Sequence, residues 1–125
     1  MRHLVESFAV GALRRGQAIE QFLGRAATET PAGVRWVSVE PTERGFVVTL
    51  HAVEDVGGGH FCDLLEFPPL DPDDEFGEEL GVEREPLAAM ALAEDKAGAV
   101  RDRWVNAGVA GAEYRDYVRA GRPTT

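Results

Sequence analysis

The side chains best suited to chemistry in this sequence are two histidines and a cysteine in residues 51–62. His60 and Cys62 are two residues apart, so on a strand they would point to the same side, and His51 could join them from a neighbouring strand. Such a set could hold a metal ion or activate a thiolate. The spacing matches no zinc signature, however, and the sequence has no second cysteine. We therefore expect Cys62 to be a small buried hydrophobic side chain, with no metal site.

Acidic residues in the same region could supply paired carboxylates for general acid–base catalysis. The four candidates are Glu54, Asp55, Asp63 and Glu66. On a strand covering 60–67, Asp63 would lie on the more apolar face, where a carboxylate must be paired, for example with an arginine, or functional. We expect the Asp63 carboxylate to be paired. No other catalytic group supports an enzyme, so the sequence predicts no catalytic residues and no cofactor.

A glycine run precedes these residues. Gly57-Gly58-Gly59 could cradle a phosphate, but a phosphate loop leads through a Lys-Ser or Lys-Thr pair into a helix. Here His60-Phe61 leads into a predicted strand, so we interpret the glycines as a hairpin connection.

Aromatic side chains recur on the predicted strands and could stack on nucleic-acid bases. Base stacking needs a basic surround, whereas residues 34–70 contain six acids and two arginines. Core packing is therefore the expected role of these aromatic residues, which are Trp36, Phe46, Phe61 and Phe67.

The whole chain is acidic, with 125 residues and a net charge of −9. The length suits one domain, residues 1–125, that folds without a metal or disulfide. The negative charge argues against nucleic acid and anionic membrane surfaces as partners, because both are polyanions. A single cysteine indicates a reducing compartment, and no signal peptide or membrane span is expected, so the predicted location is the cytoplasm.

The spacing of apolar residues predicts the helices and strands that must position these side chains. Residues 1–24 have a helical pattern, either as two helices separated at Gly16 or as one helix kinked there. Alternating patterns predict strands over 34–40, 46–53 and 60–67, with 25–33 and 70–85 as loops. Pro41 is expected to end the first of these strands.

The C-terminal third is predicted to be helical again. Leu87, Met90, Ala93, Ala97, Val100 and Trp104 form an apolar stripe, which predicts one helix from Pro86 with Gly98 inside it and Trp104 buried against the sheet. A short helix over 112–120 follows. The predicted fold is α+β: a three-stranded antiparallel sheet, with room for a further edge strand, packed by N-terminal and C-terminal helices in the order α-β-β-β-α-α.

Two stretches carry a family resemblance. They are Val53-Glu54-Asp55-Val56 leading to 61–68 (FCDLLEFP), and 102–109 (DRWVNAGV) followed by Glu113-Tyr114. These stretches resemble small, acidic, uncharacterised bacterial proteins similar to the immunity proteins of polymorphic toxin systems. The resemblance implies a binding module and carries over no site residues.

The acidic charge is concentrated in residues 71–85, where eight acids accompany one arginine, Arg84. Phe76 and Leu80 lie within this run without periodic companions, and an apolar anchor with an acidic rim is typical of an interface that steers a basic partner. The predicted partner-binding residues are Asp71, Asp73, Asp74, Glu75, Phe76, Glu78, Glu79 and Leu80.

Three functional hypotheses follow from the charge and the missing catalytic set. The first is a non-enzymatic immunity protein that occludes the basic substrate cleft of a bacterial toxin with this acidic surface. The second is a small enzyme or ligand-binding domain with an acidic pocket around Asp63. The third is an accessory protein of another complex. A solvated loop is the structural alternative for the acidic run.

Overall fold

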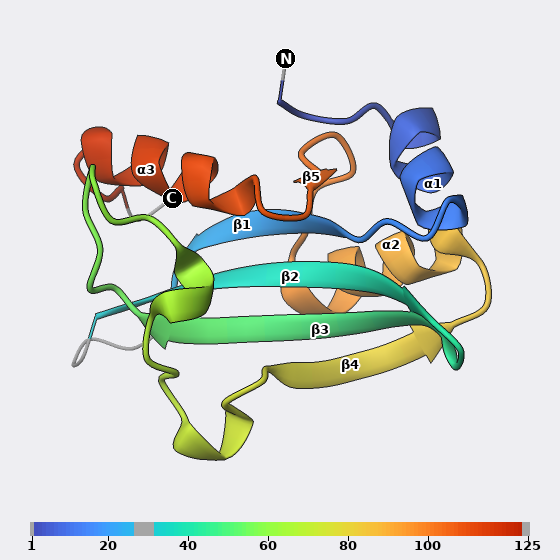
Figure 1. Cartoon of the computed structure of the whole chain (residues 1–125), viewed down its shortest axis with the longest axis horizontal. Coiled ribbons are helices and arrows are strands. Elements are labelled where there is room, and N and C mark those ends of the chain that lie inside the picture. Colours follow the sequence, from blue (N-terminus) through green and yellow to red (C-terminus); the bar gives the residue numbers. More distant parts are fainter. Residues whose placement is uncertain (1, 27–31, 124–125) are drawn as a thin grey trace.

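A five-stranded antiparallel sheet forms the centre of the molecule (Figure 1). The computed structural model describes residues 2–26 and 32–123. The strand order is β4-β3-β2-β1-β5. The strands are β1 (Ile19–Arg25), β2 (Gly33–Thr42), β3 (Gly45–Glu54), β4 (Glu78–Glu83) and β5 (Val105–Asn106), and the helices are α1 (Glu6–Arg14), α2 (Pro86–Ala97) and α3 (Ala110–Arg119). Two 3₁₀ helices, η1 (Leu64–Glu66) and η2 (Pro72–Asp74), lie between β3 and β4.

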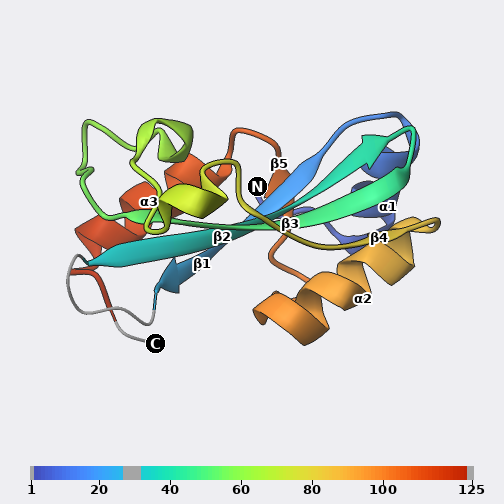
Figure 2. The same ribbon diagram turned by 90° about the horizontal axis from the view of Figure 1, so that it is seen from below.

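Both faces of the sheet are packed, by different elements (Figure 2). Along β2, Val37 and Val39 contribute to a core with α1 and α2, whereas Val34 and Trp36 contribute to a second core with α3 and η1. Successive side chains of a strand point to opposite faces, which explains why β2 supplies both cores. The α+β class and the antiparallel sheet are confirmed, but the sheet has five strands rather than three.

The β2–β3 hairpin agrees with the sequence pattern. The strands predicted over 34–40 and 46–53 pair in register from Gly33↔Glu54 to Thr42↔Gly45. Pro41 does not end β2 as expected, because it remains paired with Phe46 next to the turn.

The prediction for residues 17–24 was wrong, because these residues form most of β1 instead of a helix. The segment Ile19 to Leu23 has only three apolar residues, too few for their spacing to separate a helix from a strand. These residues form a strand because they pair with β2 on one side and with β5 on the other. Most of the loop predicted over 25–33 lies outside the described residues; Arg25 ends β1 and Gly33 starts β2.

The third predicted strand, 60–67, is also absent. The Asp63 side chain accepts the Leu65 N–H at 3.2 Å and so starts η1, a local bond that competes with strand pairing. The run Gly57-Gly58-Gly59 is therefore no hairpin turn between paired strands.

The predicted loop over 70–85 is wrong in part, because its second half is strand β4, paired to β3 at the edge of the sheet.

The predicted helix from Pro86 is shorter than expected. It ends at Gly98, whose φ of 79° is left-handed and therefore favours glycine at this cap. Val100 consequently lies outside the helix and is 48% exposed. Trp104 precedes β5 and is fully buried, so its predicted burial is confirmed although the helical stripe does not reach it. The last helix, predicted over 112–120, is present as α3.

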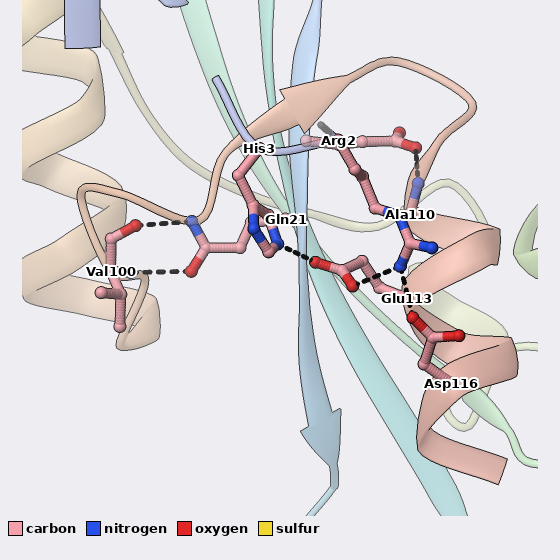
Figure 3. Close-up of polar contacts among 8 residues, drawn as sticks. Arg2, His3, Gln21, Val100, Ala110, Glu113 and Asp116 are labelled. Atoms are coloured by element: carbon pink, nitrogen blue, oxygen red, sulfur yellow. Dashed lines mark hydrogen bonds and ion pairs between the residues drawn. The ribbon is translucent and has the colours of Figure 1, made fainter. Parts of the chain in front are cut away.

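Polar contacts attach the residues before α1 to α3 (Figure 3). Arg2 pairs with Glu113 at 2.7 Å and with Asp116 at 2.6 Å, and His3 also contacts Glu113. Across the sheet edge, the Gln21 amide donates to the Val100 carbonyl at 2.9 Å and accepts its N–H at 2.7 Å. The ion pairs join α3 to the residues before α1, and the Gln21 hydrogen bonds join the segment after α2 to β1. Within residues 2–26 and 32–123, no helix is long and apolar enough to cross a lipid bilayer.

A buried polar cluster fixes the start of the β3–η1 connection. The Tyr114 hydroxyl donates to Asp55 at 2.5 Å, and Arg122 Nε donates to the same carboxylate at 2.9 Å. Asp55 is thus paired with an arginine and a tyrosine, which satisfies a buried carboxylate. The arginine pairing was expected of Asp63 instead, but Asp63 is exposed and forms no ion pair with the described residues. Burial, followed by the bond to Asp55, raises the pKa of Tyr114 to about 12.

We expect Tyr114→Phe to lower the free energy of unfolding at pH 7 by about 1.5–3 kcal/mol, because a hydrogen bond to a buried charge is lost. The folded-state pKa exceeds the ordinary value of 10, so the stability tied to the protonated hydroxyl is complete below pH 10 and lost as the pH rises through about 12. Denaturant unfolding at pH 7, 10 and 12 measures both effects. An unchanged alkaline stability profile in Tyr114→Phe would contradict this account.

Candidate functional site

The acidic run lies on η2, the turn after it and strand β4. Asp71 accepts the Asp73 N–H at 2.9 Å and starts η2, and the carboxylates of Asp73, Asp74 and Glu75 are exposed. Phe76 is 85% exposed directly after them. An exposed aromatic side chain next to acids is available to act as the apolar anchor of an interface.

The other predicted partner-binding residues have different surroundings. Glu78 and Glu79 are exposed on β4, but Glu79 accepts two hydrogen bonds from Arg44, at 2.7 and 3.0 Å. Leu80 packs against the core on the α1 and α2 side of the sheet. The sequence therefore misplaced Leu80, which side-chain alternation in β4 turns away from the acidic surface.

A cavity of about 270 Å³ lies beside Phe76, and we name it the His51 cavity. Trp36 and His51 line it with their rings stacked, 4.4 Å apart and 8° from parallel. Leu65 forms another wall and is 79% exposed. The acids Asp74 and Glu75 also line this cavity. It thus joins an aromatic floor to two exposed apolar side chains and an acidic rim.

His51 contributes no positive charge to this cavity at neutral pH. Burial lowers the pKa of His51 to about 4, and its Nε2 lies 3.3 Å from the Ser38 hydroxyl. Gly77 passes close to the ring: a Cβ there would lie 2.8 Å from Nδ1 of His51, and the φ of 92° also favours glycine. The η2 turn is therefore held directly against the His51 ring.

A second cavity of about 420 Å³ adjoins the first, and we name it the Glu20 cavity. Trp36, Leu64 and Leu65 line both cavities, and we call the two together the groove. The wall specific to the Glu20 cavity comprises Glu20, Cys62, Asp63, Gly108, Gly111, Ala112 and Arg115. The charged residues of the whole groove are Glu20, Asp63, Asp74, Glu75 and Arg115, so acids outnumber bases by four to one.

Glu20 is the residue of this site that the sequence interpretation missed. One of its oxygens, Oε1, accepts the N–H groups of Gly108 and Ala110 at 2.8 and 3.0 Å, which secures the start of α3. Burial raises the pKa of Glu20, and these two bonds oppose the rise. The available signal was the alternation of Ile19, Gln21 and Leu23, which places Glu20 on the opposite face of a strand.

Arg115 lines the same cavity as the carboxylates of Glu20 and Asp63. It forms no ion pair in the part of the chain that the structure describes, and its Nε is buried there without a hydrogen-bond acceptor. Most buried donors in proteins are satisfied, so this wall of the cavity retains unused hydrogen-bonding capacity.

The histidines and the cysteine do not assemble into a metal site. His51 stacks on Trp36, His60 is exposed and Cys62 is half-buried in the wall of the Glu20 cavity. Among residues 2–26 and 32–123, no group of three or more His, Cys, Asp or Glu side chains is arranged to hold a metal ion. Glu54, Asp55 and Glu66 line neither cavity, so the four acids that could have supplied paired carboxylates do not line one site.

We expect Cys62→Ser to change the free energy of unfolding by less than about 1 kcal/mol, because a half-buried hydroxyl can still reach water. Protein purified without added metal should contain no stoichiometric zinc in either form. Thermal unfolding and elemental analysis test the two statements. Zinc at one equivalent in the wild type, lost in the variant, would contradict them.

Comparisons with known proteins assign no family to this chain. No family model, curated protein or solved structure matches it.

Proposed function

We propose that this chain is a non-enzymatic binding protein of the immunity-protein type, which neutralises a bacterial toxin by covering its basic substrate cleft. The observation that carries the proposal is the exposure of Phe76 and Leu65 in the wall of the His51 cavity, next to the acids Asp74 and Glu75. Interfaces commonly combine a central apolar or aromatic anchor with a polar rim.

The charge distribution supports a basic partner. The acids of residues 71–79 are exposed, two of them (Asp74 and Glu75) line the His51 cavity beside Phe76, and Arg44 pairs with Glu79. A concentrated negative field accelerates encounter with a basic surface and disfavours acidic partners. The basic substrate cleft of a nuclease or another nucleic-acid-modifying toxin would be complementary to it.

A second candidate function is the binding of a small ligand. Its support is the Glu20 cavity, which has Asp63 in its wall and room for a small molecule. Ligand binding predicts affinity without a protein partner, whereas the first proposal predicts a stoichiometric protein complex.

The proposal is tested by titration against a toxin domain encoded beside this chain in its source genome. We expect one equivalent of the purified chain to abolish the toxin's activity, with a sharp end point. If no neighbouring frame encodes a toxin, or if excess chain leaves the activity unchanged, the immunity function is refuted.

A further inference from the structure

The groove has a division of chemistry that the proposed function does not by itself require. Its His51 cavity is floored by stacked rings and flanked by Leu65 and Phe76, with the exposed acids Asp74 and Glu75 at its rim. Its Glu20 cavity instead holds the carboxylates of Glu20 and Asp63 beside Arg115. Leu65 stands between the two, because it lines both. The aromatic floor of the His51 cavity thus suits an apolar group, whereas the half-buried Glu20 carboxylate in the other cavity suits a cation.

Glu20 and Asp63 each have a carboxylate oxygen available for a ligand. Both hydrogen bonds to Glu20 from the described residues use Oε1, which leaves Oε2 without a donor among them. The one hydrogen bond to Asp63 uses Oδ1, again leaving the second oxygen. A guanidinium is the cation best matched to two carboxylates, because its donors are arranged in a rigid fork.

We infer that an extended segment of the partner protein lies in the groove, with an arginine in the Glu20 cavity and an apolar side chain in the His51 cavity. Side chains two residues apart on an extended segment point the same way, which suits two cavities separated by one leucine. Arg115, which has no ion-pair partner among the described residues, is placed to donate to a backbone carbonyl of that segment. This inference rests on the proposed function and specifies how the partner is recognised.

The probe is the peptide Ac-Leu-Ala-Arg-NH2, titrated into the ¹⁵N-labelled chain. The two tryptophan indole N–H signals provide an internal comparison, because Trp36 lines the groove whereas Trp104 is fully buried in the other core. We expect the Trp36 signal to shift in a saturable way and the Trp104 signal to stay in place. A peptide with glutamine in place of arginine should bind about tenfold more weakly, the equivalent of one charge-assisted hydrogen bond.

Two variants test whether the arginine of the peptide binds in the Glu20 cavity. Glu20→Gln keeps the oxygen that accepts from Gly108 and Ala110 but removes the charge, and Asp63→Asn is the matching change across the cavity. Each should weaken the peptide about tenfold, whereas Glu43→Gln, in the exposed β2–β3 turn, should leave the affinity unchanged. Equal affinity for free arginine and the peptide would overturn the inference in favour of a small-molecule site.

The same variants separate failure of this inference from failure of the proposed function. If Glu20→Gln and Asp63→Asn neutralise the toxin as well as the wild type and bind the peptide equally, the arginine site is refuted while the immunity function stands. If the wild type does not neutralise the toxin, the immunity function is refuted whatever the peptide does.

Discussion

Reversing the charges of Asp73, Asp74 and Glu75 to lysine is expected to slow association with a basic partner by roughly 10–100-fold at low salt. These side chains are exposed on η2 and its turn, and Asp71, which caps η2, is retained, so the fold should be unaffected. The salt dependence of the rate should also become flatter, because long-range attraction is what salt screens. Stopped-flow fluorescence at several salt concentrations measures both quantities.

The control must change the net charge equally at another place. Glu43, Asp95 and Asp102 are exposed acids that line neither cavity, and their reversal to lysine provides that change. This control should slow association much less. If both triple variants slow association equally, net charge alone steers the encounter and the acidic run has no special role.

Phe76 should act on the lifetime of the complex rather than on its formation. Phe76→Ala is expected to speed dissociation roughly 30-fold, the effect of an interface anchor worth about 2 kcal/mol. Phe8→Ala is the matched control, because Phe8 is 67% exposed on α1 and lines neither cavity. A dissociation rate that is the same in both variants would remove Phe76 from the interface.

Trp104→Ala is expected to cost about 3–5 kcal/mol of unfolding free energy, a large share of the stability of one domain. Trp104 is fully buried in the core that α1 and α2 form with the sheet. Its backbone carbonyl also accepts the Leu4 N–H at 2.7 Å, which positions the segment before α1. Removing the indole leaves a cavity that these elements cannot fill without moving. Denaturant unfolding measures the loss.

Val100→Ala is the control from the same apolar stripe. Val100 is half-exposed outside α2, so its truncation should cost less than about 1 kcal/mol. Trp104→Phe should cost less than Trp104→Ala, because it keeps most of the ring and removes an indole Nε1 that has no acceptor among the described residues. Native stability in Trp104→Ala would show that this side chain is not part of the core.

The central hairpin could be predicted because its determinants are local. The alternation in Phe46 to Val53 places Val48 and Val53 in different cores, and only two residues separate β2 from β3. Residues 19–25 could not be assigned in the same way. Their strand conformation depends on pairing with Val34 to Val39, after the intervening loop, and with Val105 and Asn106, near the other end of the chain.

The candidate site was predictable only in its acidic half. A run of acids with one basic residue is visible in the sequence, and its first residues are exposed as expected. The groove depends on tertiary structure, because Trp36 meets His51 across two paired strands. The Glu20 carboxylate accepts the N–H of Ala110, 90 positions away. No spacing rule along the chain connects these residues.

Hydrogen–deuterium exchange of the complex with the neighbouring toxin domain tests most directly whether this surface binds the partner. We expect slowed amide exchange in residues 61–80, which include η1, η2 and Phe76, and unchanged exchange in α1 and α2 on the other face of the sheet. Slowed exchange in α1 and α2, with none in residues 61–80, would place the partner on the opposite face and contradict the account.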